Sequence, residues 1–256
     1  MKIKAFTLAE VLITLAIIGV VAAMTMPALI QNYQKRALET QIKHFYSTFS
    51  QAVKQYMADY GTDDLRNTPL ASDNYGEYGY ASPEAIASIR NFMTKYLKVV
   101  KECDHAPSDC FAKEYRSYDG KVDNDYGIHA MNNGYYDVYG YRDYVLADGA
   151  VVKIAYWCTM SGPVDIIVDV NGKKGPNKAG YDVLSMSLFY DGVLDAGGVD
   201  PECRKNNDYC YPWEGEKNPS SVRDNWFQSY LSSDNSSSSY GDTFGHLLEN
   251  NFKFDY

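Results

Sequence analysis

The residue best placed to do chemistry near the amino terminus is an acid, Glu10, which directly precedes a long uncharged run. From Val11 to Gln34 there are 24 residues without a charge, and most are Val, Leu, Ile, Ala or Met. A carboxylate at mid-depth in a membrane costs about 2.5–3.5 kcal/mol, so it usually has a partner or a purpose. Without its neighbours, Glu10 is equally well explained as a headgroup-layer acid or a first-turn charge that favours the helix dipole.

The uncharged run is long enough to cross a membrane. As a helix it spans about 36 Å, and a hydrocarbon layer is about 30 Å thick. Lys2 and Lys4 precede the run, and Lys35 and Arg36 follow it. A cleaved secretory signal is the alternative, but its apolar core usually has only about 7–15 residues and a small-residue cleavage site follows it. Here Pro27-Ala28-Leu29 leads into further apolar sequence, which favours a retained span.

Residues 4–19, KAFTLAEVLITLAIIG, resemble the leader and first helix of type IV pilins and type II secretion pseudopilins. In that family prepilin peptidase removes a short basic leader just before a Phe. The Phe is then N-methylated, and a Glu at the fifth mature position is retained. The resemblance places the cut between Ala5 and Phe6, the methyl group on Phe6 and the retained acid at Glu10. The family usually has Gly where this chain has Ala5, and because Ala is also small we expect cleavage with lower efficiency or in a separate subfamily.

The resemblance also implies a function and a set of partners. The chain is expected to be a structural subunit of a type IV pilus or of a type II secretion pseudopilus, with no enzymatic activity. It would pass the cytoplasmic (inner) membrane once, with its ectodomain outside, before assembly. The implied partners are prepilin peptidase, an assembly platform protein, copies of the chain and other pilin-like subunits. Glu10 would pair with the freed amine of a neighbouring subunit, and Gly19 and Pro27 fall where the helices of the family loosen on assembly.

Major pilin, minor pilin and pseudopilin share this amino terminus, so it leaves the subtype open. The large ectodomain with Tyr-rich loops and a cysteine-closed tail favours a minor pilin or adhesive tip subunit somewhat. A membrane-anchored extracellular enzyme is the competing class. None of the four histidines has a Ser, Cys or carboxylate at a motif spacing, and Asp123, Asp125 and Asp137 are interpreted as solvated loop acids.

The cysteines lie beyond the uncharged run and have a repeated spacing. Export makes disulfides plausible, and six residues separate the members of each of two pairs. We predict the local disulfides Cys103–Cys110 and Cys203–Cys210, each stabilising by about 2–3 kcal/mol, with Cys158 free. Long-range pairing such as Cys103–Cys203 stays an open alternative. Zinc is disfavoured because the ligand spacings of two to four residues are absent and His105 is the only histidine nearby.

The segment from Asp169 to Asp182, DVNGKKGPNKAGYD, is rich in oxygen ligands and glycine. Alternating Asp and Asn resemble the start of a calcium loop, but Lys173 takes the fifth position and no Glu follows at the twelfth, so it is not an EF-hand. Major pseudopilins carry calcium in a late loop, so the resemblance slightly favours a calcium site here. If calcium binds, we expect Asp169, Asn171 and Asp182 to donate oxygens, with backbone carbonyls completing the shell. The simpler interpretation is a Gly/Asn/Pro turn between two strands.

The whole-chain composition limits the classes of partner and of fold. There are 33 acidic and 24 basic side chains, a net charge of −9, which argues against nucleic acid as the main partner. An apolar content of 45% excludes a disordered chain. The 24 tyrosines indicate half-buried, wet surface, and we interpret them as ectodomain surface and subunit contacts.

The elements that must position these groups form an α+β fold. We divide the chain into a leader (1–5), a transmembrane or filament-core helix (6–34), an amphipathic continuation (35–61) and a pilin-like ectodomain (62–256) with a loop-rich carboxy-terminal region. Apolar residues recur at helical steps in the continuation, and Gly61 is placed to stop the helix. The stripe comprises Leu38, Ile42, Phe45, Phe49, Val53, Tyr56 and Tyr60.

The ectodomain is predicted to add a second helix and an antiparallel β-meander that packs on this stripe. The helix would run from Ser82 or Pro83 to about Lys101. Strands at 144–147, 151–157, 164–170 and 182–190 would follow, with turns at Asp148-Gly149 and Asp191-Gly192. After about Asn206 the sequence becomes irregular, and the pattern does not decide whether the tail is ordered.

Overall fold

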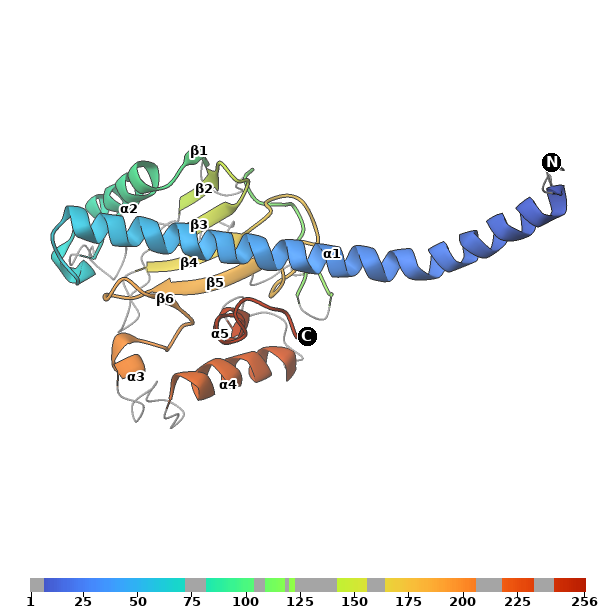
Figure 1. Ribbon diagram of the computed structural model, residues 1–256. Helices are drawn as coiled ribbons and strands as arrows, with labels where there is room; N and C mark the ends of the chain where they lie inside the picture. Colours follow the sequence, from blue (N-terminus) through green and yellow to red (C-terminus); the bar gives the residue numbers. More distant parts are fainter. Residues whose placement is uncertain are drawn as a thin grey trace, which may run out of the picture.

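The computed structural model describes residues 7–71, 82–103, 109–117, 120–122, 142–155, 164–205, 218–232 and 242–256. Its dominant element is helix α1, Leu8–Asp59, with 52 residues. The carboxy-terminal half of α1 lies across a sheet, and the amino-terminal half projects from the folded body as a curved arm (Figure 1). We call residues 8–34 the amino-terminal arm. This arrangement is the predicted one, a long helix on an antiparallel sheet.

The carboxy-terminal half of α1 buries the predicted apolar stripe except for Tyr60, which is 43% exposed. Leu38, Ile42, Phe45, Phe49, Ala52, Val53, Tyr56 and Met57 are all buried. Tyr60 caps the helix, and Gly61 follows with φ +64°, a left-handed conformation that glycine adopts without a steric penalty. A short 3-10 turn, η1 (Leu65–Asn67), then leads away from the helix.

Six antiparallel strands form one sheet in the order of the sequence, β1-β2-β3-β4-β5-β6. Their bounds are β1 Val99–Cys103, β2 Arg142–Leu146, β3 Val151–Ala155, β4 Val164–Asp169, β5 Val183–Leu188 and β6 Leu194–Asp195. The two predicted Asp-Gly turns join β2 to β3 and β5 to β6, with φ of +94° at Gly149 and +76° at Gly192. The meander is therefore confirmed, with two further short strands at its edges.

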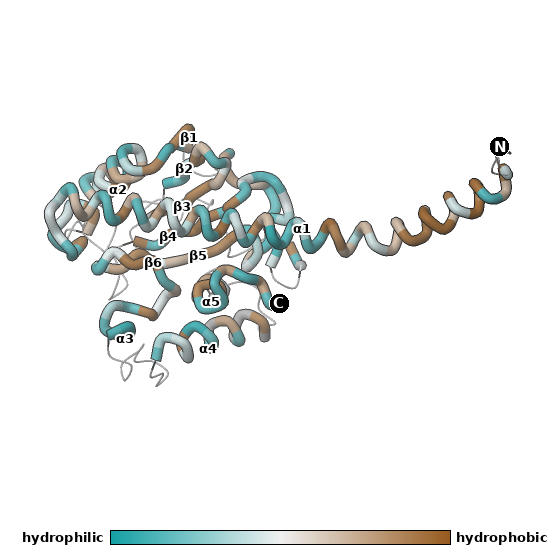
Figure 2. Tube along the Cα trace, viewed as in Figure 1, coloured by the Kyte–Doolittle hydropathy of each residue, from teal (hydrophilic) through white to brown (hydrophobic). Residues whose placement is uncertain are grey.

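Alternate residues of the strands enter two different cores. One face, with Tyr144, Val152, Ile166 and Leu184, packs in the large cluster that includes α1. The opposite face, with Val151, Ile167 and Val183, packs in a smaller cluster. The remaining members of the smaller cluster are Cys103, Cys110, Phe111, Tyr115 and Ala179. Figure 2 shows apolar residues along the central strands and along the amino-terminal arm.

Helix α2 is shorter than predicted. It runs Pro83–Tyr96, with Ser82 as N-cap accepting from the amide of Ala85, and it ends five residues before Lys101. The residues after it extend into β1 and pair with β2. Because Val99 and Val100 are β-branched and lie next to an open strand edge, sheet pairing replaces the last helical turn.

The carboxy-terminal region, whose order the sequence pattern did not decide, contains helices in its described residues. It contains α3 (Pro201–Lys205), α4 (Pro219–Ser232) and α5 (Asp242–Glu249). Phe244 of α5 and Phe252 beyond it pack on Tyr46 of α1, with ring centroids 6.0 and 5.2 Å away. On α4, Arg223 donates to both carboxylate oxygens of Asp195 at the end of β6. These contacts fasten the tail to the sheet edge and to α1.

The tyrosines are not all surface residues. Tyr56, Tyr115 and Tyr144 are among the largest fully buried side chains. The hydroxyl of Tyr56 accepts from the backbone amide of Leu70 at 3.1 Å, and burial raises its pKa to about 12. Part of the tyrosine excess therefore fills the core, where the hydroxyls of Tyr56 and Tyr115 have polar partners and that of Tyr144 is buried without one.

Candidate functional site: the amino-terminal arm and the acidic loop

The predicted assembly acid, Glu10, lies in the first turn of α1. Thr7 is the N-cap, and its backbone amide and hydroxyl donate to Oε2 of Glu10 at 2.8 and 2.9 Å. The amide of Glu10 donates in return to the hydroxyl of Thr7 at 3.3 Å. This reciprocal capping box holds the carboxylate at the tip of the arm. Ala5 and Phe6 lie outside the described residues.

Apolar side chains of the arm have no cover from the folded body. Leu8 is 77% exposed, Leu12 58% and Leu29 69%. Among the described residues, α1 is the one helix long and apolar enough to cross a membrane, and the most apolar window of it is entirely unburied. Its two threonines are satisfied locally, since Thr14 donates to the carbonyl of Val11 and Thr25 to that of Val21. The arm is thus a surface suited to lipid or to other apolar helices.

The proposed loosening points of the arm lie within continuous helix. α1 passes through Gly19 and Pro27 without a break. Pro27 has no amide hydrogen to donate to the preceding turn, and a Cβ at Gly19 would meet nothing within 4 Å. Both positions are therefore free of packing constraints here, and their role on assembly stays a prediction.

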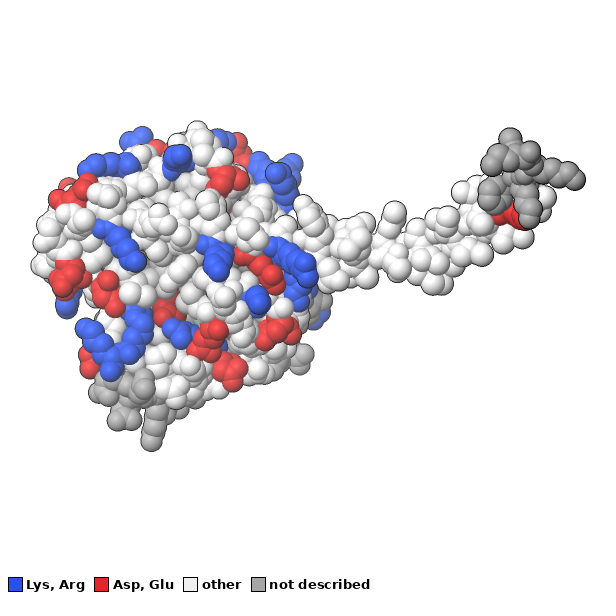
Figure 3. All heavy atoms as spheres, in the orientation of Figure 1, with Lys and Arg blue, Asp and Glu red and all other residues white. Residues whose placement is uncertain are grey.

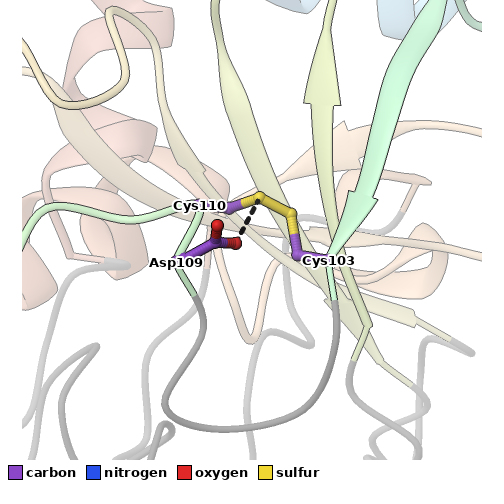
Figure 4. A group of neighbouring side chains, drawn as sticks. All are labelled: Cys103, Asp109 and Cys110. Atoms are coloured by element: carbon purple, nitrogen blue, oxygen red, sulfur yellow. Dashed lines mark hydrogen bonds between the residues drawn. A yellow bond between two sulfur atoms is a disulfide. The ribbon is translucent and has the colours of Figure 1, made fainter.

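The first predicted disulfide is present. Cys103, at the end of β1, forms a disulfide with Cys110 (Figure 4), and both belong to the smaller hydrophobic cluster on the face of the sheet opposite α1. This pairing excludes the alternative Cys103–Cys203. Asp109 lies beside the sulfur of Cys110, but the two sulfurs are bonded to each other and are not available as thiolate ligands for a metal. Cys203 is also in a disulfide, and because Cys158 and Cys210 lie outside the described residues, its pairing with Cys210 stays a prediction.

The three predicted calcium ligands come together in the structure. We call residues 169–182, between β4 and β5, the acidic loop. Asp169 and Asp182 are both fully buried. The amide of Asn171 donates to Oδ1 of Asp169 at 3.2 Å, and the side chain of Asn171 is hydrogen-bonded to Asp182. The three residues, which lie within one loop of the sequence, therefore form one cluster in the structure.

The two carboxylates are held in an unfavourable environment for negative charge. Burial, together with the charge of Asp182, raises the pKa of Asp169 to about 8. Burial raises the pKa of Asp182 to about 6, although the amides of Asn177 and Lys178 donate to it at 2.7 and 2.6 Å. A cation bound between these two acids would favour the ionised form of both.

Two further oxygens in the same loop lack partners. Oδ1 of Asn171 and Oδ1 of Asn177 are buried and accept no hydrogen bond. Asn177 has φ +51°, a left-handed conformation that Asn tolerates better than most residues. Asp169, Asn171, Asn177 and Asp182 thus offer hard oxygen atoms of the kind that calcium prefers, and the residues fit that ion.

The sequence prediction missed two members of this cluster. Tyr115 donates from its hydroxyl to Oδ2 of Asp169 at 2.7 Å, and it lies 54 residues earlier in the chain. No local pattern connects residues at that distance. Asn177 lies inside the segment considered, and its place after Gly175-Pro176 is a turn signal that marks it as a candidate for left-handed backbone.

The described histidines do not form a catalytic arrangement with a nucleophile. His44 lies 3.6 Å from Asp148 on the surface, and His246 lies 2.8 Å from Asp255. His246 also contacts the amide nitrogen of Asn250 and stacks on Phe227. These contacts link α5 to the end of the chain.

Comparison with known families supports the interpretation of the amino terminus. The model of the prokaryotic N-terminal methylation motif matches residues 1–26. The model of a family of unknown function, DUF6613, matches residues 28–136. No curated protein and no solved structure matches the chain.

The methylation motif, the long apolar helix and the antiparallel sheet together define a type IV pilin-like protein. The motif supports a type IV pilin or pseudopilin precursor of the kind that prepilin peptidase processes. Proteins with this motif are structural rather than catalytic.

Proposed function

We propose that this chain is a structural subunit of a type IV pilus or type II secretion pseudopilus that assembles through its amino-terminal arm. The observation that carries the proposal is the arm itself, which exposes a continuous apolar surface and holds Glu10 at its tip. Before assembly the arm anchors the subunit in the cytoplasmic membrane, with the ectodomain outside. In the filament, neighbouring arms replace lipid, and Glu10 pairs with the amine that cleavage creates at Phe6.

Glu10 variants test this role. Glu10→Gln is the sharper variant because glutamine keeps a side-chain oxygen for the capping box and loses only the charge. We expect it to reach the membrane fraction in normal amount and to give no sheared filaments. Glu84→Gln, the same change in the first turn of α2, should assemble normally. Normal filament yield from Glu10→Gln would remove the assembly role of the charge.

Amino-terminal analysis of sheared filaments tests processing and subtype. A mass spectrum with methylated Phe6 as the first residue supports the cut after Ala5. A chain that keeps Met1 to Ala5 in filaments contradicts it. Stoichiometric abundance of the chain identifies a major subunit, and a trace amount identifies a minor or tip subunit.

We further propose that calcium binds to the acidic loop. Asp169, Asn171 and Asp182 would supply side-chain oxygens, and Asn177 offers another unpartnered oxygen. The charge of the ion would stabilise the ionised form of two buried acids whose pKa values are now raised. Millimolar calcium should raise the melting temperature of the full chain in detergent, and Asp182→Asn should reduce that rise. A melting temperature that does not respond to calcium or to chelator would dismiss the site, and magnesium at equal concentration is the control for ionic strength.

A further inference from the structure

A cavity lies at the point where the arm meets the folded body. It has a volume of about 670 Å³ and lies between α1 and the acidic loop. The helix contributes residues from Gln31 to Gln41, and the loop contributes residues from Asn171 to Tyr181. Tyr256 at the end of the described chain completes the wall. We call it the membrane-end cavity.

The lining of the membrane-end cavity is unlike the rest of the chain in charge. Lys35 and Lys174 line it, and no acidic side chain does so among the described lining residues. The whole chain, in contrast, has nine more acidic than basic side chains. Figure 3 shows Lys and Arg, with some Asp and Glu among them, where α1 leaves the folded body, and an arm beyond it that carries no Lys or Arg and is acidic only near its tip. The cavity is therefore a locally basic site on an acidic protein.

The arm fixes the height of the cavity relative to a membrane. The 23 residues from Val11 to Tyr33 span about 34 Å as a helix, slightly more than a hydrocarbon layer of about 30 Å. With these residues in the layer, Tyr33 and Lys35 lie at the level of the outer headgroups. Tyrosine is enriched at that level, and Tyr33 is 73% exposed.

The basic residues at this level run against the usual charge distribution. Lysine and arginine near a span normally gather on the cytoplasmic side, but in the proposed orientation Lys35 and Arg36 lie on the outer side. Removal of residues 1–5 would also delete the cytoplasmic Lys2 and Lys4. A basic cluster on the outer side therefore calls for a partner there, and the phosphate of an anionic lipid has the complementary charge.

We propose that the membrane-end cavity binds the headgroup of an anionic phospholipid of the outer leaflet, with Lys35 and Lys174 toward the phosphate. Lys35 is held in place, because its Nζ donates to the backbone oxygen of Tyr256 at 3.2 Å and lies 5.8 Å from the ring centroid of Phe254. Tyr181 stacks on Phe254 and forms an aromatic wall for the glycerol region. The bound lipid seats the ectodomain on the membrane before the subunit is extracted into a filament.

The inference rests on the membrane-anchored state in the proposed function, and one experiment separates the two. The full-length chain is reconstituted in nanodiscs of phosphatidylcholine with or without phosphatidylglycerol. Incorporation of the chain reports anchoring by the arm. Lipids that remain bound after detergent release are then counted by native mass spectrometry. We expect phosphatidylglycerol to be retained at least threefold over phosphatidylcholine.

Single-residue variants locate the site. Lys174→Gln should lower phosphatidylglycerol retention at least threefold, since this exposed lysine faces the cavity. Lys54→Gln is the matched control, on an exposed part of the same helix farther from the arm. Equal retention of the two lipids, or an equal loss with Lys54→Gln, would overturn the proposal. Retention of a second copy of the chain in place of lipid would assign the cavity to a subunit contact instead.

Discussion

Tyr115 and Asp169 form a buried hydrogen bond of 2.7 Å between segments that are 54 residues apart. The bond joins the chain that follows the Cys103–Cys110 disulfide to the start of the acidic loop. Burial and the negative charge of Asp169 raise the pKa of Tyr115, so its hydroxyl remains a donor at all ordinary pH values. This hydrogen bond therefore ties the smaller hydrophobic cluster, on the face of the sheet opposite α1, to the acidic loop.

The first prediction concerns pH. Asp169 has a pKa raised to about 8, and Asp165 and Asp182 have values raised to about 6. Each binds its proton more tightly in the folded state, so the free energy of unfolding should fall as pH rises from about 4 to about 8. Asp169→Asn should flatten the upper part of this decline. Urea titrations of the full chain in calcium-free detergent buffer measure it, and stability that rises over the same range contradicts it.

A second prediction concerns the buried ion pair between β2 and β3. Lys153 and Asp143 lie opposite each other, with Nζ 2.8 Å from Oδ1 and both side chains almost fully buried. Asp143→Ala should destabilise by about 3–5 kcal/mol because it leaves a buried ammonium without its carboxylate. Replacing both residues, by Asp143→Leu with Lys153→Met, should cost much less than the single change. A double variant as unstable as the single one would show that the charges themselves are required.

The elements and contacts of this fold differ in how far the sequence predicts them. The stripe from Leu38 to Tyr56 and the Asp-Gly turns are local signals, and they predict α1 and the meander correctly. The calcium candidates come together because they lie within one loop. Tyr115 meets Asp169 through the tertiary fold, and no periodicity encodes such a contact. Helix α4 has little apolar periodicity, because its contacts with the sheet include a polar one, the ion pair of Arg223 with Asp195. The sequence pattern therefore gave no sign of this helix.

The third prediction tests the close packing of the β5–β6 turn against α1. A Cβ at Gly192 would lie 2.4 Å from the sulfur of Met57 and 3.3 Å from a methyl group of Val53. The residue also has φ +76°, which strains any side chain. Gly192→Ala should therefore destabilise by roughly 1–3 kcal/mol. The control is Gly197→Ala, where the new methyl group would meet nothing within 4 Å and the melting temperature should barely change.

The fourth prediction concerns the disulfide. Cys103→Ser opens the link between β1 and the segment that contains Phe111 and Tyr115. We expect a loss of about 2–3 kcal/mol in the free energy of unfolding, measured by urea titration without reductant. Reductant should then have a smaller effect on the variant than on the native chain. If the native chain without reductant is no more stable than the variant, the bond does not contribute to stability.

The lengthwise contact of α1 with the sheet has a mechanical consequence. Its buried positions extend from Leu38 to Met57, about 30 Å of helix, and the arm continues from this segment without a break. Tension on the arm parallel to this segment therefore loads the contact in shear, and the side chains along its whole length resist together. A sideways pull would instead peel them apart turn by turn. The contact between α1 and the sheet should therefore resist the largest force when that force acts along the axis of α1.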